Sequence, residues 1–305
     1  MTSSSAVRRA RLYVILAALL WSVGGLFTRI LRKDTFLGVN DPLLSPLQIA
    51  FFRVLFAGLV FLPLLRYRDL TYRPVMIVMV GCFTMMNILF VSAMVLGSAA
   101  NAILLQNSAP FWVYLVCVYG FREPHDRRTL QSILVGMAGV SVIIAGSWLR
   151  DGFGRLDVTA MALVSGMMYG GIILCLRALK DHSSMYLTAQ NHLGSAFFLG
   201  VGIAVIHGTV FFADWVTTPT TRQLAFLAFF GTVQMALPYA LFARGLKHLT
   251  PQEAGMITLL EPLLNPLWTY MISPETDTPT TATWIGGALI IGALAWRYAP
   301  RRATA

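Results

Sequence analysis

The stretch TLLEPLLNPLW, residues 258–268, places a carboxylate, an asparagine and two prolines in an otherwise apolar run. A proline inside a helix removes a backbone hydrogen bond and bends the helix. A carboxylate is costly to bury in an apolar medium, and here Glu261 stands directly before Pro262. Such a segment needs surroundings that satisfy its polar groups, and the rest of the chain indicates what those surroundings are.

The chain as a whole is too apolar for a soluble domain. Its 305 residues are 57% hydrophobic and 12% charged, with a mean hydropathy of +0.69, whereas soluble domains carry about 25% charged residues. Apolar runs of about 18 residues or more, separated by short charged breaks, are typical of membrane-spanning helices. We predict an all-α polytopic membrane protein with ten spans, near 11–31, 46–65, 74–96, 98–120, 129–147, 157–176, 184–206, 223–243, 251–272 and 281–297.

The formal charge of +10 is explained by where the basic residues fall along these spans. With the N-terminus inside, 16 of the 23 Lys and Arg residues lie in inner segments and 6 at outer ends, and Arg53 alone lies within a span. Cytoplasmic segments carry such an excess of positive charge. The charge therefore predicts two cytoplasmic termini, not a nucleic-acid partner. We expect the segment 11–31 to be a retained first span, not a cleaved signal peptide.

An internal repeat is visible at a shift of 152 residues, where Pro110 aligns with Pro262 and Glu123 aligns with Glu275. Each copy would hold five helices, and because five is odd, the second copy enters the membrane from the opposite side. Transporters built in this way bind substrate near the midplane between the repeats, although channels and structural proteins can also be duplicated. We predict two inverted five-helix repeats within one transmembrane domain, residues 1–150 and 151–305.

Arg53 and Glu261 are the only formal charges deep within the predicted spans. Charges at this depth usually face a bundle interior or an aqueous cavity. Glu261 either contacts a cationic substrate group or couples transport to protons, or it makes a structural hydrogen bond to a neighbouring helix. For Arg53 we favour a structural role, with its guanidinium snorkelling or bonded to backbone carbonyls.

Prolines beside polar groups form a second set of candidates. Gln106 precedes Pro110, Gln234 precedes Pro238, and Glu261 precedes Pro262. Kinks next to polar groups suit a midplane pocket with moving gates, and we predict gating kinks at Pro110 and Pro262. The alternative for each amide is ordinary hydrogen bonding between helices.

Aromatic side chains inside the spans form a third set: Trp21, Trp112, Tyr114, Tyr169, Tyr239 and Trp268. A pocket lined by rings and amides suits a flat, amphipathic organic molecule, whereas a lone membrane aromatic more often faces lipid. Trp21 stands out because it aligns with Tyr169 at a related shift of 148 residues.

The sequence gives little indication of proton transfer, metal binding or catalysis. Gln190, Asn191 and His192 fan over about 200° of a helix, so part of the seventh span is expected to be buried, with proton transfer by His192 as the less favoured interpretation. The three cysteines fall within spans and predict neither a disulfide nor a metal site. The chain contains no nucleotide-binding loop, HExxH or GxSxG, so we expect no cofactor and no ATP-driven or hydrolytic chemistry.

Taken together, these residues resemble the drug/metabolite transporter superfamily. The resemblance rests on Trp21, on the Arg in FFRVLFAG (51–58) and on the closing WIGGALIIGALAW (284–296). It rests above all on APFWVYLVCVYGFREP (109–124) and LEPLLNPLWTYMISPET (260–276), each with an in-span proline followed by a loop Glu. The sequence is most similar to the EamA-type branch, which exports amino acids and other metabolites from bacteria.

This resemblance implies an exporter in the bacterial inner membrane, with a central cavity lined by spans one, three, four, six, eight and nine. The residues that those spans contribute are Trp21, Asn87, Gln106, Tyr169, Gln234 and Glu261. Aromatic amino-acid exporters belong to this superfamily, and the ring-rich interior is compatible with such a substrate.

We therefore predict a non-enzymatic exporter, embedded in the lipid bilayer, for small amphipathic metabolites, with amino acids bearing aromatic or apolar side chains favoured. It would work by alternating access, and coupling to a proton or another ion stays open, as does the oligomeric state. One alternative is an exporter of cationic drugs or nucleobase-like compounds. A second is an integral membrane enzyme acting on lipids, for which FREPHDRR (121–128) is the candidate surface cluster, and a third is a scaffold or receptor.

Overall fold

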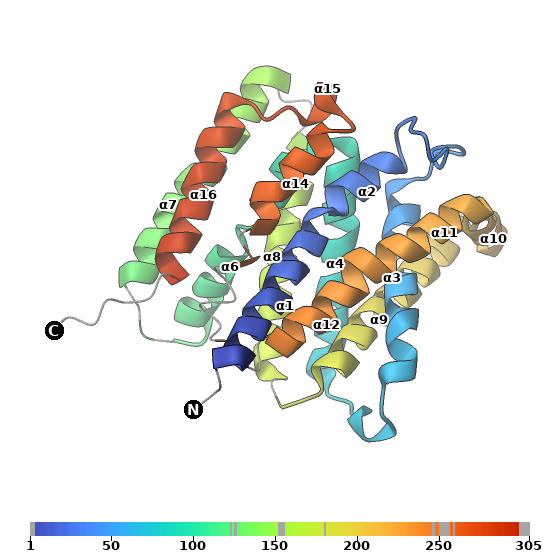
Figure 1. Ribbon diagram of the computed structural model, residues 1–305, viewed down its shortest axis with the longest axis horizontal. Helices are drawn as coiled ribbons and strands as arrows, with labels where there is room; N and C mark the ends of the chain where they lie inside the picture. The colour runs from blue at the N-terminus through green and yellow to red at the C-terminus, as the bar shows by residue number, and fades with distance from the viewer. Residues whose placement is uncertain are drawn as a thin grey trace.

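The computed structural model describes residues 4–122, 124, 127–151, 156–179, 181–245, 248–249, 257–258 and 260–298, which form a helical bundle without strands (Figure 1). Within these residues, eight helical segments are long and apolar enough to cross a membrane. They are Ser5–Ile30, Pro46–Leu64, Pro74–Leu96, Ala99–Gly120, Arg127–Gly146, Leu156–Ala178, Ser184–His207 and Thr221–Phe242. The first eight predicted spans are therefore confirmed as helices, and the first begins earlier than expected.

Several of these segments consist of more than one helix. The first joins α1 (Ser4–Ser22) to α2 (Gly24–Ile30), and the second is α3 (Pro46–Phe61) with the short η1 (Leu62–Leu64). The third is α4 (Pro74–Leu96), and the fourth joins α5 (Ala99–Gln106), α6 (Ala109–Leu115) and η3 (Val116–Gly120). The others are α7 (Arg127–Asp151), α8 (Leu156–Ala178), α9 (Ser184–His207) and, for the eighth, α11 (Thr221–Phe230), η5 (Gly231–Ala236) and α12 (Leu237–Gly245).

Two further helices occupy the positions of the predicted ninth and tenth spans, α14 (Leu260–Tyr270) and α16 (Thr281–Tyr298), with the short α15 (Pro274–Asp277) between them. Residues 251–256 and 259, which belong to the predicted ninth span, lie outside the described residues. Ten spans arranged as an inverted repeat therefore stay a prediction.

Polar side chains cap the starts of three helices, and one of them also binds a backbone carbonyl of another helix. Ser45 and Gln48 form a capping box at α3, and Thr220 and Gln223 form another at α11. The amide of Gln48 also donates to the Trp215 carbonyl at 2.9 Å. At α5, the Ser98 hydroxyl accepts from the backbone N–H of Asn101. These bonds satisfy backbone groups that a helix start leaves unpaired.

Small residues bring some helices very close together. A Cβ added to Gly139 of α7 would lie 2.5 Å from the Gly286 carbonyl oxygen of α16, and the converse contact has the same distance. Membrane helices often associate through such small residues, because the backbones can approach closely. Figure 1 shows α7 and α16 side by side at one edge of the bundle.

A short helix that follows α9 was not predicted. After α9, Gly208 adopts a positive φ of 91°, which a residue with a side chain rarely adopts, and the short α10 (Thr209–Thr217) follows. The Trp215 ring of α10 is buried and lies 5.4 Å from the Phe51 ring of α3, measured between centroids. The sequence did not indicate this helix, because so short a segment shows no strong periodic pattern.

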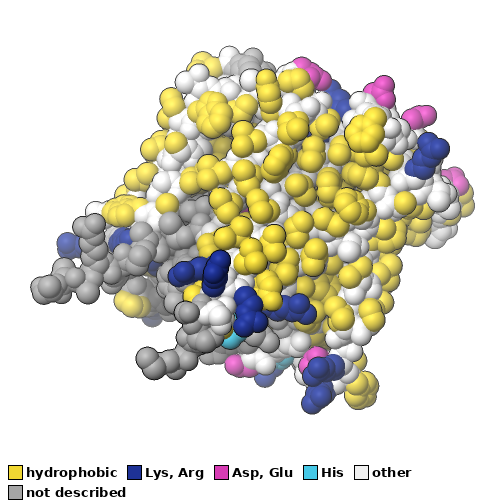
Figure 2. Space-filling model, in the orientation of Figure 1, with side chains coloured by type: hydrophobic (Ala, Val, Ile, Leu, Met, Phe, Trp, Pro, Cys, Tyr) yellow, Lys and Arg dark blue, Asp and Glu magenta, His cyan; other side chains and the backbone are white. Residues whose placement is uncertain are grey.

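The outer surface is apolar over the middle of the bundle. Large hydrophobic side chains such as Ile77, Leu134 and Phe197 are more than half exposed. In the face shown in Figure 2, hydrophobic side chains cover the middle, and charged side chains gather toward the two ends. A bundle with this surface suits the hydrocarbon core of a membrane. The start of α1 and the end of α16 lie at the same end of the bundle (Figure 1), which we call the N-terminal end.

Candidate functional site

The first span is interrupted between α1 and α2, and two amide side chains bind the carbonyl groups at the interruption. The Gln234 Nε2 donates to the Trp21 carbonyl at 3.3 Å, and the Asn265 Nδ2 donates to the Ser22 carbonyl at 2.9 Å. Gly24 permits this approach, because a Cβ at that position would lie 2.8 Å from the Gln234 Nε2. Backbone carbonyls in a membrane need such partners. The first span is thus fastened to η5 and to α14.

Aromatic rings and a carboxylate lie beside this interruption. The half-buried Trp21 ring lies 5.2 Å from the Tyr239 ring and 5.3 Å from the Phe242 ring, measured between centroids. Glu261, also half-buried, lies one helical turn before Asn265 on α14. We call Trp21, Gln234, Tyr239, Phe242 and Glu261 the central site. It contains three of the six predicted binding residues.

Gln234 is positioned by a local widening of the eighth span. The segment η5 is a π-helix, and Pro238 follows it within α12. Proline has no N–H, and its ring clashes with the carbonyl of the residue four positions earlier, which here is Gln234. A wider turn relieves that clash, and π segments are frequent at functional sites.

Arg53 and Asn87 bind each other behind the central site. The Asn87 Oδ1 accepts from the Arg53 Nε at 3.0 Å and from a terminal nitrogen at 2.7 Å, and its amide nitrogen donates to the Ala50 carbonyl at 3.0 Å. Arg53 is 2% exposed, Asn87 is 0% exposed, and the guanidinium lies over the Phe230 ring. The structural role expected for Arg53 is supported, but its partner is an amide side chain, not the backbone carbonyls that we expected. Asn87 holds Arg53 in place, and its role in substrate binding stays a prediction.

His192 lies next to this pair and is fully buried, as part of the polar run in the seventh span was expected to be. Its Nδ1 is 2.7 Å from the Thr188 carbonyl oxygen, which assigns the proton to that nitrogen. The ring lies 4.9 Å from the Phe83 ring and 5.6 Å from the Tyr239 ring, so it packs between α4 and α12. Its Nε2 is buried and has no hydrogen-bond partner among the described residues.

The other predicted residues lie on a different pair of helices. Gln106 is the last residue of α5, and Tyr169, 40% exposed, lies on α8. The fourth span breaks directly after Gln106, and Pro110 opens the next helix, α6. The span is interrupted at Asn107 and Ser108, just before Pro110, and the gating kink at Pro110 stays a prediction. Pro262 lies in the first turn of the described part of α14, so a kink at that position is untested.

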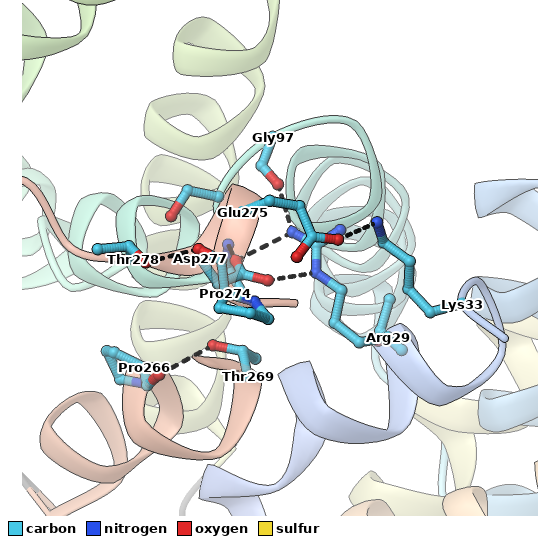
Figure 3. Close-up of polar contacts among 12 residues, drawn as sticks. Arg29, Lys33, Gly97, Pro266, Thr269, Pro274, Glu275, Asp277 and Thr278 are labelled. Carbon is cyan, nitrogen blue, oxygen red and sulfur yellow. Dashed lines mark hydrogen bonds and ion pairs between the residues drawn. The ribbon is translucent and has the colours of Figure 1, made fainter. Parts of the chain in front are cut away.

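A buried ion pair lies at the end of the bundle opposite the N-terminal end, where Figure 1 shows α2 and α15 and Figure 3 shows the contacts. Arg29 of α2 binds Asp277 of α15 through two hydrogen bonds, from Nε at 2.6 Å and from Nη2 at 3.0 Å. Nη2 also donates to the Gly97 carbonyl at 2.6 Å, and the Asp277 carboxylate accepts from the Ala99 backbone N–H at 3.0 Å. This network joins the first span, the start of the fourth and the loop that leads into α16.

An exposed pair lies beside it. Lys33 donates to the Glu275 carboxylate at 2.7 Å, and this hydrogen bond lowers the pKa of the Glu275 carboxyl from its ordinary value. Exposed pairs of this kind contribute little to stability, so the buried Arg29–Asp277 pair dominates the network. Glu275 is the loop Glu of the predicted second repeat, and it lies beside the buried pair.

Comparison with known proteins identifies the family of this chain. The EamA-like transporter family matches residues 8–145 and 158–298, nearly the whole chain. The chain belongs to this family. The resemblance seen in the in-span prolines and loop glutamates is therefore confirmed at the level of the family.

Relatives of this EamA-like transporter span its full length. An uncharacterized transporter of Archaeoglobus fulgidus is 28% identical over 289 residues, covering 93% of this chain and 95% of that protein. The uncharacterized transporter YwfM of Bacillus subtilis is 25% identical over 311 residues, covering 95% and 94%. A crystal structure of another protein has a TM-score of 0.60 at 17% identity, covering 94% of this chain and 96% of that one, and it supports the fold alone.

Sequence reasoning missed the Arg29–Asp277 pair of this EamA-like transporter. Arg29 was counted only as a basic residue at an outer end, and Asp277 was overlooked beside the loop Glu275. A signal was present, because both residues adjoin predicted span ends on the same side of the membrane. Charge complementarity between two such ends predicts a contact, although the sequence alone does not say which ends are adjacent.

Proposed function

We propose that this EamA-like transporter exports small amphipathic metabolites, with amino acids that carry aromatic or apolar side chains as the favoured substrates. The observation that carries the proposal is the central site, where the Trp21 ring packs against Tyr239 and Phe242 and the Gln234 amide binds the Trp21 carbonyl, with Glu261 on the neighbouring helix α14. Rings bind an apolar or aromatic side chain, and Glu261 provides a partner for an ammonium group. The family match supports transport and leaves the substrate open.

Alternating access is the proposed mechanism. The family matches two ranges of similar length, which supports two repeats of one architecture. The buried Arg29–Asp277 network joins the first span, the start of the fourth and α15 at one end of the bundle, and we propose that it closes this end until a transported molecule is released there. We propose that the N-terminal end faces the cytoplasm of a bacterial cell, as the excess of basic residues at that end favours.

Transport into liposomes tests the proposal. Purified protein in proteoliposomes should move radiolabelled phenylalanine or tryptophan down its gradient faster than protein-free liposomes do. Repeating the assay with imposed pH or sodium gradients then reveals any coupling ion. If a broad panel of metabolites shows no uptake above the protein-free background, the proposal is wrong.

Export of cationic drugs or nucleobase-like compounds is the second candidate, and the carboxylate of Glu261 beside aromatic rings favours it. A cation over an aromatic face and near a carboxylate is bound by both. The substrate that the wild-type protein moves separates the two candidates: cationic compounds for this one, and phenylalanine or tryptophan for the first. Under either candidate Glu261→Gln should weaken uptake, because the cation or the ammonium group loses its carboxylate partner. Glu275→Gln is the matched control, since that carboxylate is exposed at the closed end.

A further inference from the structure

A cavity of about 330 Å³ lies away from the central site, between α6, η3, α7, α8 and α16. None of the six predicted binding residues lines it. In terms of predicted spans, its walls come from the fourth, fifth, sixth and tenth, whereas the resemblance implied a cavity between spans one, three, four, six, eight and nine. This space shares the fourth and sixth spans with the proposed transport site but is lined by different residues.

The break in the fourth span explains why this space is open. At the break, α8 approaches so closely that a Cβ on Gly166 would lie 2.6 Å from the Ser108 Oγ, and one on Gly170 would lie 3.2 Å from the Ala109 carbonyl oxygen. On the other side, α7 and α16 are joined tightly through their glycines. The helix α6 therefore packs against α8, and α7 packs against α16, which leaves the cavity between these two pairs of helices.

The cavity extends along α7. Its wall on this helix runs from Thr129 to Val140, which is about three helical turns, or about 16 Å at 1.5 Å per residue. This length suits an extended hydrocarbon chain.

The walls are apolar along the cavity and polar at its ends. Ile133, Met137 and Ile290 line the middle. Asn107 lies at the break inside the span. Thr129, near the start of α7, and Arg297, near the end of α16, lie at the N-terminal end of the bundle. Arg297 is the single charged residue among those that line the cavity, all of which are described.

We propose that this cavity binds one amphiphile that has a single unbranched chain and an anionic head group. The chain extends along α7 toward Asn107, and the head group pairs with the Arg297 guanidinium at the N-terminal end, as carboxylates and phosphates do with arginine. At about 330 Å³ the cavity lies at the lower end of the range for small-molecule sites, about 300–1,000 Å³, which suits one short chain. Such a chain comes either from a free fatty acid or from a bilayer lipid.

Photo-crosslinking tests this site. The full-length protein in nanodiscs of neutral phosphatidylcholine is irradiated with a twelve-carbon carboxylate that carries a diazirine at the end of its chain, and labelled residues are mapped by mass spectrometry. Labelling should concentrate on α7 near Met137 and Val140 and on Ile173 of α8. Excess dodecanoate should suppress it at least fivefold, whereas 1-dodecanol, which has no charge, should leave it nearly unchanged.

Variants separate head-group recognition from general partitioning into the bilayer. Arg297→Gln should reduce labelling at least fivefold, while Arg297→Lys should retain most of it. Gly136→Leu fills the cavity from its wall and should also abolish labelling without removing any charge. Arg222→Gln is the matched control, because this arginine lies at the start of α11, away from the cavity. An unchanged thermal transition for each variant shows that the fold is intact.

The composition of the nanodisc bilayer distinguishes a free fatty acid from a bilayer lipid as the source of the hydrocarbon chain. Suppression by free dodecanoate in neutral nanodiscs assigns the site to soluble acids, and loss of labelling only in phosphatidylglycerol nanodiscs assigns it to an anionic lipid. Either result supports the site. Labelling that is as strong on the lipid-facing Leu134 and Ile285 as inside the cavity would overturn it, and so would equal competition by 1-dodecanol.

Discussion

At the scale of single residues, Trp21 contributes both its backbone and its ring to the central site. Its carbonyl binds the Gln234 amide, and its ring packs against Tyr239 and Phe242. The sequence singled out Trp21 because a large ring stood at the corresponding place in each proposed repeat. It did not predict the interruption after Ser22, since no proline or charge marks that position.

Replacing Trp21 by alanine should weaken transport of aromatic substrates. An aromatic pair contributes about 0.5–1.5 kcal/mol beyond its burial, which corresponds to a roughly two- to tenfold rise in the KM for phenylalanine. Trp21→Phe should retain most of the affinity. Trp284→Ala, which removes an exposed ring of α16, is the control, measured in the same proteoliposome assay. An equal rise in KM for Trp21→Ala and Trp284→Ala would contradict a substrate contact at Trp21.

Asn87 tests the difference between a binding residue and a positioning residue. Asn87→Ala leaves the buried Arg53 without its acceptor and should lower the free energy of unfolding by about 1.5–3 kcal/mol, the contribution of a hydrogen bond to a charged group. Asn87→Asp keeps the acceptor oxygens and should restore most of that stability. Denaturant unfolding in detergent measures both.

The kinetic readout for Asn87 separates the two roles. Asn87→Asp should leave the KM for substrate unchanged if Asn87 only holds Arg53. A stable Asn87→Ala protein with a raised KM would instead place Asn87 in the substrate site, as the family resemblance implies.

At the scale of helices, the sequence located most elements because apolar runs of span length rarely form anything other than membrane helices. The fourth span is interrupted just before the in-span Pro110, and the gating kink predicted at that proline stays a prediction. The π segment η5 and the short α10 were not predicted, because both depend on tertiary contacts: η5 packs against α3, and α10 packs against α9 and, through Trp215, against α3. The additional cavity could not be located either, since hydropathy shows which spans exist and not which ones are neighbours.

The Arg29–Asp277 pair makes a prediction at this scale. Removing one partner of a buried pair leaves an uncompensated charge, so Arg29→Ala should destabilise the protein by about 3–5 kcal/mol. The exchange Arg29→Asp with Asp277→Arg should recover part of the loss. Thermal unfolding in detergent measures the change, and Lys33→Ala is the control, since its partner Glu275 is exposed.

The same pair should govern access to the closed end. In Asp277→Asn, a cysteine placed at the buried Thr28 of α2 should react faster with a membrane-impermeant maleimide, provided that the three native cysteines are first replaced by serine. If the network does not close this end, the labelling rate will be the same with and without Asp277→Asn.

At the scale of the whole molecule, composition alone predicted a membrane protein, because 12% charged residues cannot cover the surface of a soluble chain of this length. Sequence motifs predicted the EamA-like family, and the family match confirmed it. The sequence did not determine the substrate, because the choice of substrate depends on which few side chains converge in the folded protein. Of the six residues predicted to bind it, Trp21, Gln234 and Glu261 lie in the central site, whereas Asn87 binds Arg53, and Gln106 and Tyr169 lie on α5 and α8.

The central claim is that the rings and the carboxylate of the central site bind an amphipathic amino acid that the protein then transports. The most direct measurement is counterflow of radiolabelled phenylalanine in proteoliposomes preloaded with unlabelled substrate, compared between the wild-type protein and Trp21→Ala. We predict accumulation of label in wild-type liposomes, competed by tryptophan and reduced in Trp21→Ala. Counterflow at the level of protein-free liposomes, or counterflow that Trp21→Ala leaves unchanged, would contradict the claim.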